Sequence, residues 1–470
     1  MSVTKIRWDP ASFRDPEGSV FFHGDNVYRT FPEHNIIRMH DLINSSFFKN
    51  FVENGNIIKT EIVNDTIIGN ASQFLHLLKH EKIPFITYPY EWSFYMLKDS
   101  ALLTLSILAE CLKNNFVLKD GTAWNITFHK GKMCFLDILS IGTYNDGQIW
   151  EGYGQFCREF LYPLLISCYK NIDFHSFFRG SLKGIDPKIA NGFFTIFDWR
   201  HPGIFKHVFL NSKLTYQKSI GNSEIKNKFH LPKESLINIV NNLKKVIENL
   251  HPGHKDSIWQ SYNQNNTYTD ADSIIKRDFI KYAVDHFKGH GSIVDLGCNT
   301  GEYSIIAAQK ENVTACDIDP ACIDQIYVKT QSVNTKITPV VLDLMNPSAQ
   351  CGWKLQERSQ IFERLKPNSF LALALIHHIC IASNVPLESF ISFLASISSQ
   401  GVLEWVDKKD PMVQFLLRNR EDVFQNYTWD YFQKTVSQYF RIECIQDLNA
   451  GTRKLCLLRP LTKEIKSDIA

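Results

Sequence analysis

Glycines and carboxylates follow each other at short intervals in the C-terminal half of the chain. The run IVDLGCNTGE places Asp295, Gly297 and Gly301 in a D-x-G-x-x-x-G pattern, between an apolar segment and a helical one. Gly297 permits a tight turn, and Gly301 permits close approach of the backbone to a neighbour. Dinucleotide-binding enzymes carry G-x-G-x-x-G at this turn, and this chain does not. The pattern therefore indicates a binding loop without a pyrophosphate cradle.

Carboxylates stand where the next two apolar segments end. Asp317 follows the second segment, where an acidic residue can accept hydrogen bonds from both hydroxyls of a ribose; Asp319 is the alternative. Asp343 closes the third segment, in VVLDLMNPS. Acids at three successive strand ends, with Asp295 as the first, are a more specific signal than any glycine pattern alone.

The elements that must hold these residues alternate along the chain. Strands are expected at 292–296, 313–316, 337–342, 370–376 and 401–406, and helices at 304–309 and 320–328. Strands separated by helices pair in parallel and have both faces covered. The C-terminal half is therefore predicted to be an α/β domain with a Rossmann-like, mostly parallel sheet.

The D-x-G-x-x-x-G loop resembles motif I of class I S-adenosylmethionine (SAM)-dependent methyltransferases, where it wraps the amino-acid part of SAM. Asn299 stands where the commonest form of the motif has a third glycine, and asparagine also tolerates left-handed backbone. The resemblance implies a seven-stranded sheet, with Asp343 at the adenine amine. It implies that SAM is bound by Asp295, Gly297, Cys298, Asn299, Gly301, Asp317, Ile318, Asp343 and Leu344.

Nearly the whole chain is similar to a group of bacterial two-part methyltransferases that includes rhizobial host-specificity nodulation proteins. The stretches that carry this similarity are IPFITYPYEWSFYMLKD, LKDGTAWNITF, VDLGCNTGEYS, LALALIHHI, NVPLESF and LEWVDKKDPMV. The resemblance implies methyl transfer from SAM to an oxygen or nitrogen acceptor. It does not identify the acceptor.

Candidate catalytic groups follow the fourth and fifth predicted strands. His377 or His378 could act as a general base near neutral pH, or the two could be a packing pair. Glu404, with Asp407 and Asp410, could face a substrate or be solvated loop charges. Methyl transfer needs mainly alignment of the reacting atoms, so a missing catalytic motif is no objection.

The N-terminal half has a motif of its own. Asp120, Asn125 and Asp137 have a spacing similar to the protein-kinase catalytic loop and the metal-binding aspartate that follows it. However, a glycine-rich phosphate loop and a V-A-I-K lysine are missing, and Leu118 and Leu139 replace the kinase His and Gly. A kinase-like α+β domain that recognises substrate is expected; the alternative is a strand–turn–strand in which the polar residues shape the turn.

Composition limits the other possibilities. The 51 basic and 49 acidic residues give a net charge of +2, so nothing marks a strong nucleic-acid binder. The N-terminus has no signal-peptide pattern, the apolar stretch 370–382 is too short for a bilayer, and the cysteines form no C-x-x-C pair. A cytoplasmic protein without membrane or metal sites is expected.

Two domains, a linker between them and three hypotheses follow. The predicted boundaries are 1–222 for the α+β domain, 223–254 for a helical linker that ends at Pro252-Gly253, and 255–465 for the methyltransferase domain. Trp259, Tyr262 and Tyr268, ahead of the glycine loop, could cover the cofactor or pack at the domain seam. The chain could be a methyltransferase, a bifunctional protein that also uses ATP and Mg²⁺ at its N-terminal half, or a non-catalytic SAM-binding adaptor. The oligomeric state stays open.

Overall fold

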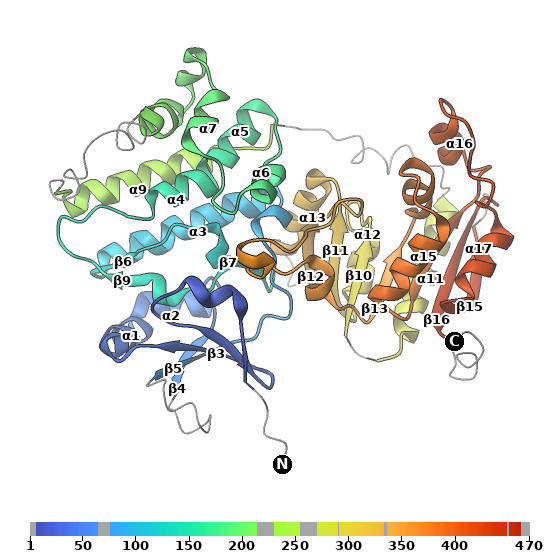
Figure 1. Ribbon diagram of the computed structural model, residues 1–470, viewed down its shortest axis with the longest axis horizontal. Coiled ribbons are helices and arrows are strands. Elements are labelled where there is room, and N and C mark those ends of the chain that lie inside the picture. Colours follow the sequence, from blue (N-terminus) through green and yellow to red (C-terminus); the bar gives the residue numbers. More distant parts are fainter. Residues whose placement is uncertain are drawn as a thin grey trace. The chain divides into compact units, whose positions relative to one another are not determined.

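The computed structural model describes residues 6–63, 76–213, 230–253, 270–289, 291–332, 336–448 and 451–461. The chain divides into two compact units: residues 1–255 with 349–359, and residues 256–348 with 360–470 (Figure 1). Residues 349–359 belong to the first unit, although they lie between two parts of the second unit in the sequence.

The first unit begins with an antiparallel sheet in the order β1-β2-β3-β5-β4. Its strands are β1 (Arg7–Trp8), β2 (Val20–His23), β3 (Asn26–Phe31), β4 (Thr60–Val63) and β5 (His76–His80), and helices α1 (Ile36–Asn44) and α2 (Ser46–Glu53) lie between β3 and β4. Tyr28 of β3 stacks on Phe21 of β2 at a centroid distance of 5.4 Å, and both rings are buried. Cross-strand aromatic pairs of this kind fix the register of a hairpin.

A helical part follows the sheet in the first unit. Its helices are α3 (Phe94–Lys113), α4 (Tyr153–Phe156), α5 (Tyr162–Lys170), α6 (His175–Gly180), α7 (Pro187–Gly192) and α9 (Lys233–Glu248). Two short hairpins, β6 (Phe116–Leu118) with β9 (Ile141–Thr143) and β7 (Ile126–His129) with β8 (Lys132–Phe135), follow α3. Because α3 is apolar on most of its surface, it is buried among these elements.

Helix α9 is the helical part of the predicted linker, and it belongs to the first unit. Its apolar stripe, which includes Leu236, Val240 and Leu243, is buried, and α9 runs along α3 (Figure 1). Lys98 of α3 donates hydrogen bonds of 2.8 Å to the carbonyls of Glu248 and Leu250, and so caps the C-terminal end of α9. An apolar stripe needs a partner surface, and α3 supplies it.

The second unit is built on one sheet in the order β12-β11-β10-β13-β14-β16-β15. The strands are β10 (Ser292–Leu296), β11 (Asn312–Asp317), β12 (Ile337–Val341), β13 (Ser369–Ala372), β14 (Gly401–Val406), β15 (Phe440–Asp447) and β16 (Arg453–Pro460). The first five strands in this order pair in parallel, and β16 pairs antiparallel with both β14 and β15. The chain order therefore reverses at β10, which is the switch point where α/β sheets bind ligands.

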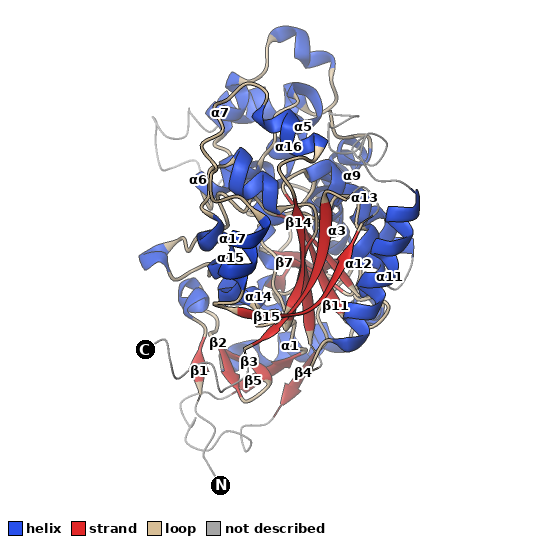
Figure 2. Ribbon diagram, turned by 90° about the vertical axis from the view of Figure 1, so that its right-hand side faces the viewer, coloured by secondary structure: helices blue, strands red, loops and turns tan. Residues whose placement is uncertain are grey.

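Helices cover both faces of this sheet. Figure 2 shows α11 (Asp270–His286), α12 (Glu302–Ala307) and α13 (Pro320–Ser332) on one side of the strands, and α15 (Leu387–Ile397) and α17 (Trp429–Val436) on the other. Helices α14 (Ile361–Leu365) and α16 (Pro411–Leu417) complete the unit. The mostly parallel, Rossmann-like sheet is thus present as predicted, because strands buried on both faces read as apolar runs in the sequence.

Candidate functional site

Three residues of the loop after β10 have a left-handed backbone conformation. Gly297, Asn299 and Gly301 have φ angles of 73°, 50° and 79°. A Cβ atom on Gly301 would lie 2.9 Å from Cγ1 of Ile326, and one on Gly297 would lie 3.2 Å from Cδ1 of Leu375. Glycine is therefore required at 301 both for its backbone conformation and for the close packing of α13.

The loop is also tied to the neighbouring strand β11. The N–H groups of Gly297 and Cys298 donate to the Cys316 carbonyl at 2.8 and 3.0 Å. The Asn299 N–H donates to Oδ2 of Asp317 at 2.7 Å, and the Asp319 N–H donates to Oδ1 at 2.9 Å. Burial raises the pKa of Asp317, and these backbone donors lower it in part. Each carboxylate oxygen has a second lone pair, so Asp317 can hold the loop and still accept a ligand hydroxyl.

Asp295 supports the loop from the interior. Its side chain is buried, and Oδ2 accepts a 2.6 Å hydrogen bond from the Ser304 hydroxyl of α12. Burial, which outweighs the Ser304 bond, raises the pKa of Asp295 to about 6. Asp295 therefore fixes α12 to β10. The sequence prediction missed Ser304, whose only signal is its place in the first turn of the following helix.

The third predicted acid lies at the same edge of the sheet. Strand β12 is parallel to β11 and pairs Val341 with Asp317, so Asp343 comes two residues beyond that pair. Oδ1 of Asp343 accepts from the Met345 N–H at 2.8 Å. Ile318 is exposed and Leu344 is half-buried. The ends of β10, β11 and β12 thus bring together the loop, Asp317 and Asp343, which their spacing in the sequence predicted.

Glu404 belongs to a buried ion network and lies inside β14, within the predicted strand 401–406. Oε2 accepts from Lys276 Nζ of α11 at 2.7 Å and from the Ala374 N–H at 3.0 Å, and Oε1 lies 3.4 Å from Arg453 Nη1 of β16. Arg453 Nε also donates to Asp410 at 2.7 Å. The side chains of all four charged residues are at most 3% exposed. Glu404 therefore holds the backbone at Ala374, which has a φ of 49°.

Lys276 and Arg453 were not predicted as partners of Glu404. Arg453 begins RKLCLLRP, a strand of buried apolar residues. A charged residue in an apolar strand signals a buried counter-ion, but the sequence does not say which one.

The two histidines after β13 are both largely enclosed. His377 is fully buried, neither of its ring nitrogens has a hydrogen-bond partner among the described residues, and its ring lies 4.2 Å from that of His378. Burial, followed by the charge of Arg453, lowers the pKa of His378 to about 4, and burial, followed by the interaction with His378, lowers the pKa of His377 well below its ordinary value. Both imidazoles are thus neutral at pH 7, and both are weak proton acceptors in this state.

In the first unit, the structure brings Asp120, Asn125 and Asp137 together. Asn125 Nδ2 donates to Oδ2 of Asp137 at 3.2 Å, and burial followed by the charge of Asp137 raises the pKa of Asp120. Asp137 already has a cationic partner, because Arg29 Nη1 of β3 donates to its Oδ1 at 2.6 Å. Arg29 also pairs with Asp15. The guanidinium thus neutralises the carboxylate that a metal ion would need.

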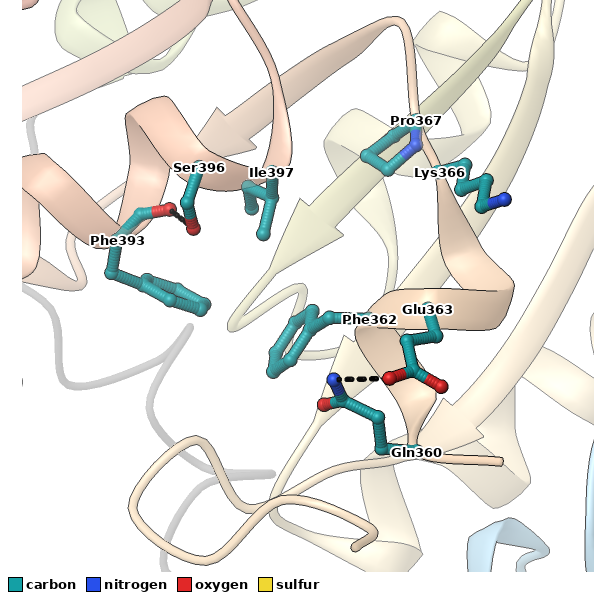
Figure 3. A pocket seen from close by; sticks show the side chains of 8 residues that line it. All are labelled: Gln360, Phe362, Glu363, Lys366, Pro367, Phe393, Ser396 and Ile397. Carbon is teal, nitrogen blue, oxygen red and sulfur yellow. Dashed lines mark hydrogen bonds between the residues drawn. The ribbon is translucent and has the colours of Figure 1, made fainter. Parts of the chain in front are cut away.

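A shallow pocket of about 490 Å³ lies elsewhere on the second unit (Figure 3). It is lined by residues that precede β13 and β14, including Lys366, Pro367 and Ile397, and Phe362 and Phe393 face each other across it at 5.0 Å. It is therefore at the amino ends of the parallel strands. The glycine loop is at the carboxyl ends, where such sheets bind ligands, so this pocket is not the predicted site.

Membrane-spanning helices and metal-binding clusters are both absent from the described residues. None of the described helices is long and apolar enough to cross a bilayer. Within the same residues, no group of three His, Cys, Asp or Glu side chains is arranged to hold a metal ion. Trp259, Tyr262 and Tyr268 lie outside the described part of the chain.

The second unit has a Rossmann-like α/β fold, with a glycine loop at the switch point of its sheet and acids after the next two strands. Over 449 residues, the chain is 33% identical to nodulation protein NoeA of Rhizobium meliloti (strain 1021), and the match covers 92% of this chain and 91% of NoeA. The chain belongs to the NoeA family. The predicted resemblance to rhizobial nodulation proteins is thereby confirmed. No protein-family model matches the chain.

Solved structures match about two-fifths of the chain. N-methyltransferase NodS from Bradyrhizobium japonicum WM9 is 10% identical, and the match covers 41% of this chain and 98% of NodS with a TM-score of 0.29. Magnesium protoporphyrin IX methyltransferase from Synechocystis PCC 6803, solved with bound SAM, is 17% identical. The match covers 44% of this chain and 86% of that methyltransferase, with a TM-score of 0.28.

Proposed function

We propose that this protein is a SAM-dependent methyltransferase, in which the second unit binds SAM and the first unit selects the acceptor. The observation that carries the proposal is the Asp317 carboxylate, which closes the glycine loop and keeps lone pairs for the ribose hydroxyls. The left-handed backbone at Gly297, Asn299 and Gly301 gives the loop the tight turn that the proposal needs at the end of β10. The acceptor is an oxygen or nitrogen atom of a molecule not yet identified.

Each residue of the site has a definite task. Asp317 holds the ribose, and Asp343 with Leu344 and Ile318 borders the adenine. The backbone of Gly297, Cys298, Asn299 and Gly301 accommodates the amino-acid part, and Asp295 fixes the loop from behind. SAM supplies a methyl group on a sulfonium, which is already a good leaving group. The protein therefore contributes mainly alignment and the exclusion of water.

A general base is needed only if the acceptor must lose a proton. His378 is the better candidate, because part of its side chain is exposed and His377 is enclosed. Glu404 acts as a positioning residue, since both its oxygens are engaged by Lys276, Arg453 and the Ala374 N–H.

The proposal is tested by calorimetric titration with SAM and with S-adenosylhomocysteine, on the wild-type chain and on Asp317→Ala. Micromolar binding by the wild type that is lost in the variant supports the site. Absence of binding by the wild type contradicts it. An adaptor that only binds SAM is distinguished by turnover, because formation of S-adenosylhomocysteine with any acceptor requires methyl transfer.

A further inference from the structure

Residues 349–359 form a small hairpin that belongs to the first unit. Cys351 and Arg358 pair antiparallel, and their N–H groups donate to each other's carbonyls at 3.1 and 3.2 Å. Gly352, Lys354 and Leu355 have φ angles of 84°, 54° and 59°, which reverse the chain between them. We call residues 351–358 the docking hairpin.

The side chain of Arg358 lies on aromatic rings of the first unit. Its Cζ atom is 4.8 Å from the ring centroid of Trp124 and 5.7 Å from that of Tyr88. The rings of Tyr88, Tyr90 and Trp124 pack against one another with centroids 5.6 to 6.0 Å apart. A planar guanidinium over aromatic faces gains both stacking and cation–π attraction, which increases when the groups are partly desolvated. We call these three rings the docking surface.

Two further anchors flank this contact. Glu357 is only 6% exposed and accepts a hydrogen bond from Arg14 Nε. The Tyr90 hydroxyl lies 4.0 Å from Cys351 Sγ. Cys351, Glu357 and Arg358 therefore attach the hairpin to the rest of the first unit.

The ends of the hairpin are also fixed in the second unit. The Ile361 N–H donates to the Ser348 carbonyl at 3.1 Å, and this hydrogen bond joins the two points at which the chain leaves and re-enters that unit. Asp343 and Leu344 lie a few residues before Ser348. The chain that borders the adenine thus continues directly into the docking hairpin.

We propose that docking of this hairpin on the Tyr88, Tyr90 and Trp124 surface preorganises the adenine side of the SAM site. The partner of this aromatic surface is a segment of the same chain, and Arg358 is its anchor. A segment restrained at its far end has fewer conformations to lose when it closes on a ligand, so the ligand binds more tightly. Arg358 is then a positioning residue for SAM, although it belongs to the other unit. The inference rests on the proposed function.

The test is a set of calorimetric titrations with SAM, joined to hydrogen exchange of the Met345 and Asn346 amides. Arg358→Ala and Trp124→Leu are each expected to raise the Kd for SAM by about fivefold or more, as is typical of coupled sites. The Kd of the double variant is expected to be no higher than that of the single variant that binds SAM more weakly, because both changes remove the same contact between Arg358 and Trp124. Faster exchange at residues 345 and 346 is expected in all three.

Lys354→Ala is the matched control, because Lys354 is an exposed residue of the same hairpin. Its affinity and exchange should equal those of the wild type. Unchanged SAM affinity and unchanged exchange in Arg358→Ala, with a wild-type melting curve, would overturn the inference while the proposed function stands. Failure of the wild-type chain to bind SAM would overturn both.

Discussion

The Asn299 N–H donates a 2.7 Å hydrogen bond to the Asp317 carboxylate, and so joins the loop after β10 to the end of β11. Asp317, which is proposed to bind the ribose hydroxyls, therefore also fixes the conformation of the loop. Loss of this carboxylate should affect both tasks at once.

Asp317→Ala should weaken SAM binding by at least about tenfold, since hydrogen bonds to a charged group are lost. Asp317→Asn keeps one carbonyl oxygen as an acceptor and should lie between the alanine variant and the wild type. Calorimetry measures the three affinities. Asp430→Ala, which removes an exposed carboxylate from α17, is the control, and an equal loss in that variant would speak against a specific role for Asp317.

Gly301→Ala should lower the free energy of unfolding for two reasons, the left-handed backbone and the contact with Ile326. Gly451→Ala separates them, because Gly451 also has a positive φ, of 71°, and no described atom lies within 4 Å of its Cβ position. The backbone cost is about 1 kcal/mol in both variants. Urea unfolding should show an additional loss of about 1 kcal/mol or more in Gly301→Ala. Equal losses in the two variants would mean that Ile326 gives way without cost.

Glu404→Gln should be strongly destabilising, by about 3 kcal/mol, because it leaves Lys276 and Arg453 buried without the carboxylate that they share. Adding Lys276→Met should recover part of the loss by removing a buried charge that has lost its carboxylate, since Arg453 keeps Asp410. Chemical unfolding of the single and double variants measures the coupling. If Glu404→Gln has the same free energy of unfolding as the wild type, the ion network of Glu404, Lys276 and Arg453 does not stabilise the fold.

The free energy of unfolding should fall as the pH rises from about 4.5 to about 7, because Glu159 loses its proton over this range. This side chain is buried, and although Thr122 and Ala123 donate to it, burial raises its pKa to about 7. The unfolded chain then releases the proton at lower pH than the folded chain, so folding is favoured most below pH 4.5 and loses this contribution by pH 7. The change is about 3 kcal/mol. Glu159→Gln cannot titrate, so the difference between its unfolding free energy and that of the wild type should depend on pH over this range alone.

ATP with Mg²⁺ at millimolar concentration should leave the melting temperature unchanged. Arg29 already neutralises Asp137, which would otherwise bind the metal. Thermal unfolding with and without the nucleotide measures the effect. A clear rise in the wild type that is absent in Asp137→Ala would favour the bifunctional hypothesis instead.

Local patterns in the sequence were sufficient for the five parallel strands of the second unit, but they did not locate the antiparallel strands β15 and β16. Asp295, Gly297, Asp317 and Asp343 were recognisable because strand ends, turns and glycine positions are set by short-range spacing. The same spacing gave the parallel sheet and the proximity of Asp120, Asn125 and Asp137, which lie close together in the chain.

What the sequence by itself determined is where the five parallel strands lie along the chain and which acids stand at their ends, since both can be read from local patterns. Only the tertiary structure decided which charges meet. Glu404 pairs with Lys276 and Arg453, Asp137 with Arg29, and Arg358 with Trp124, and each pair is far apart in sequence. Such pairs are chosen by packing, because a buried charge needs a partner but its own neighbours in the chain do not specify which.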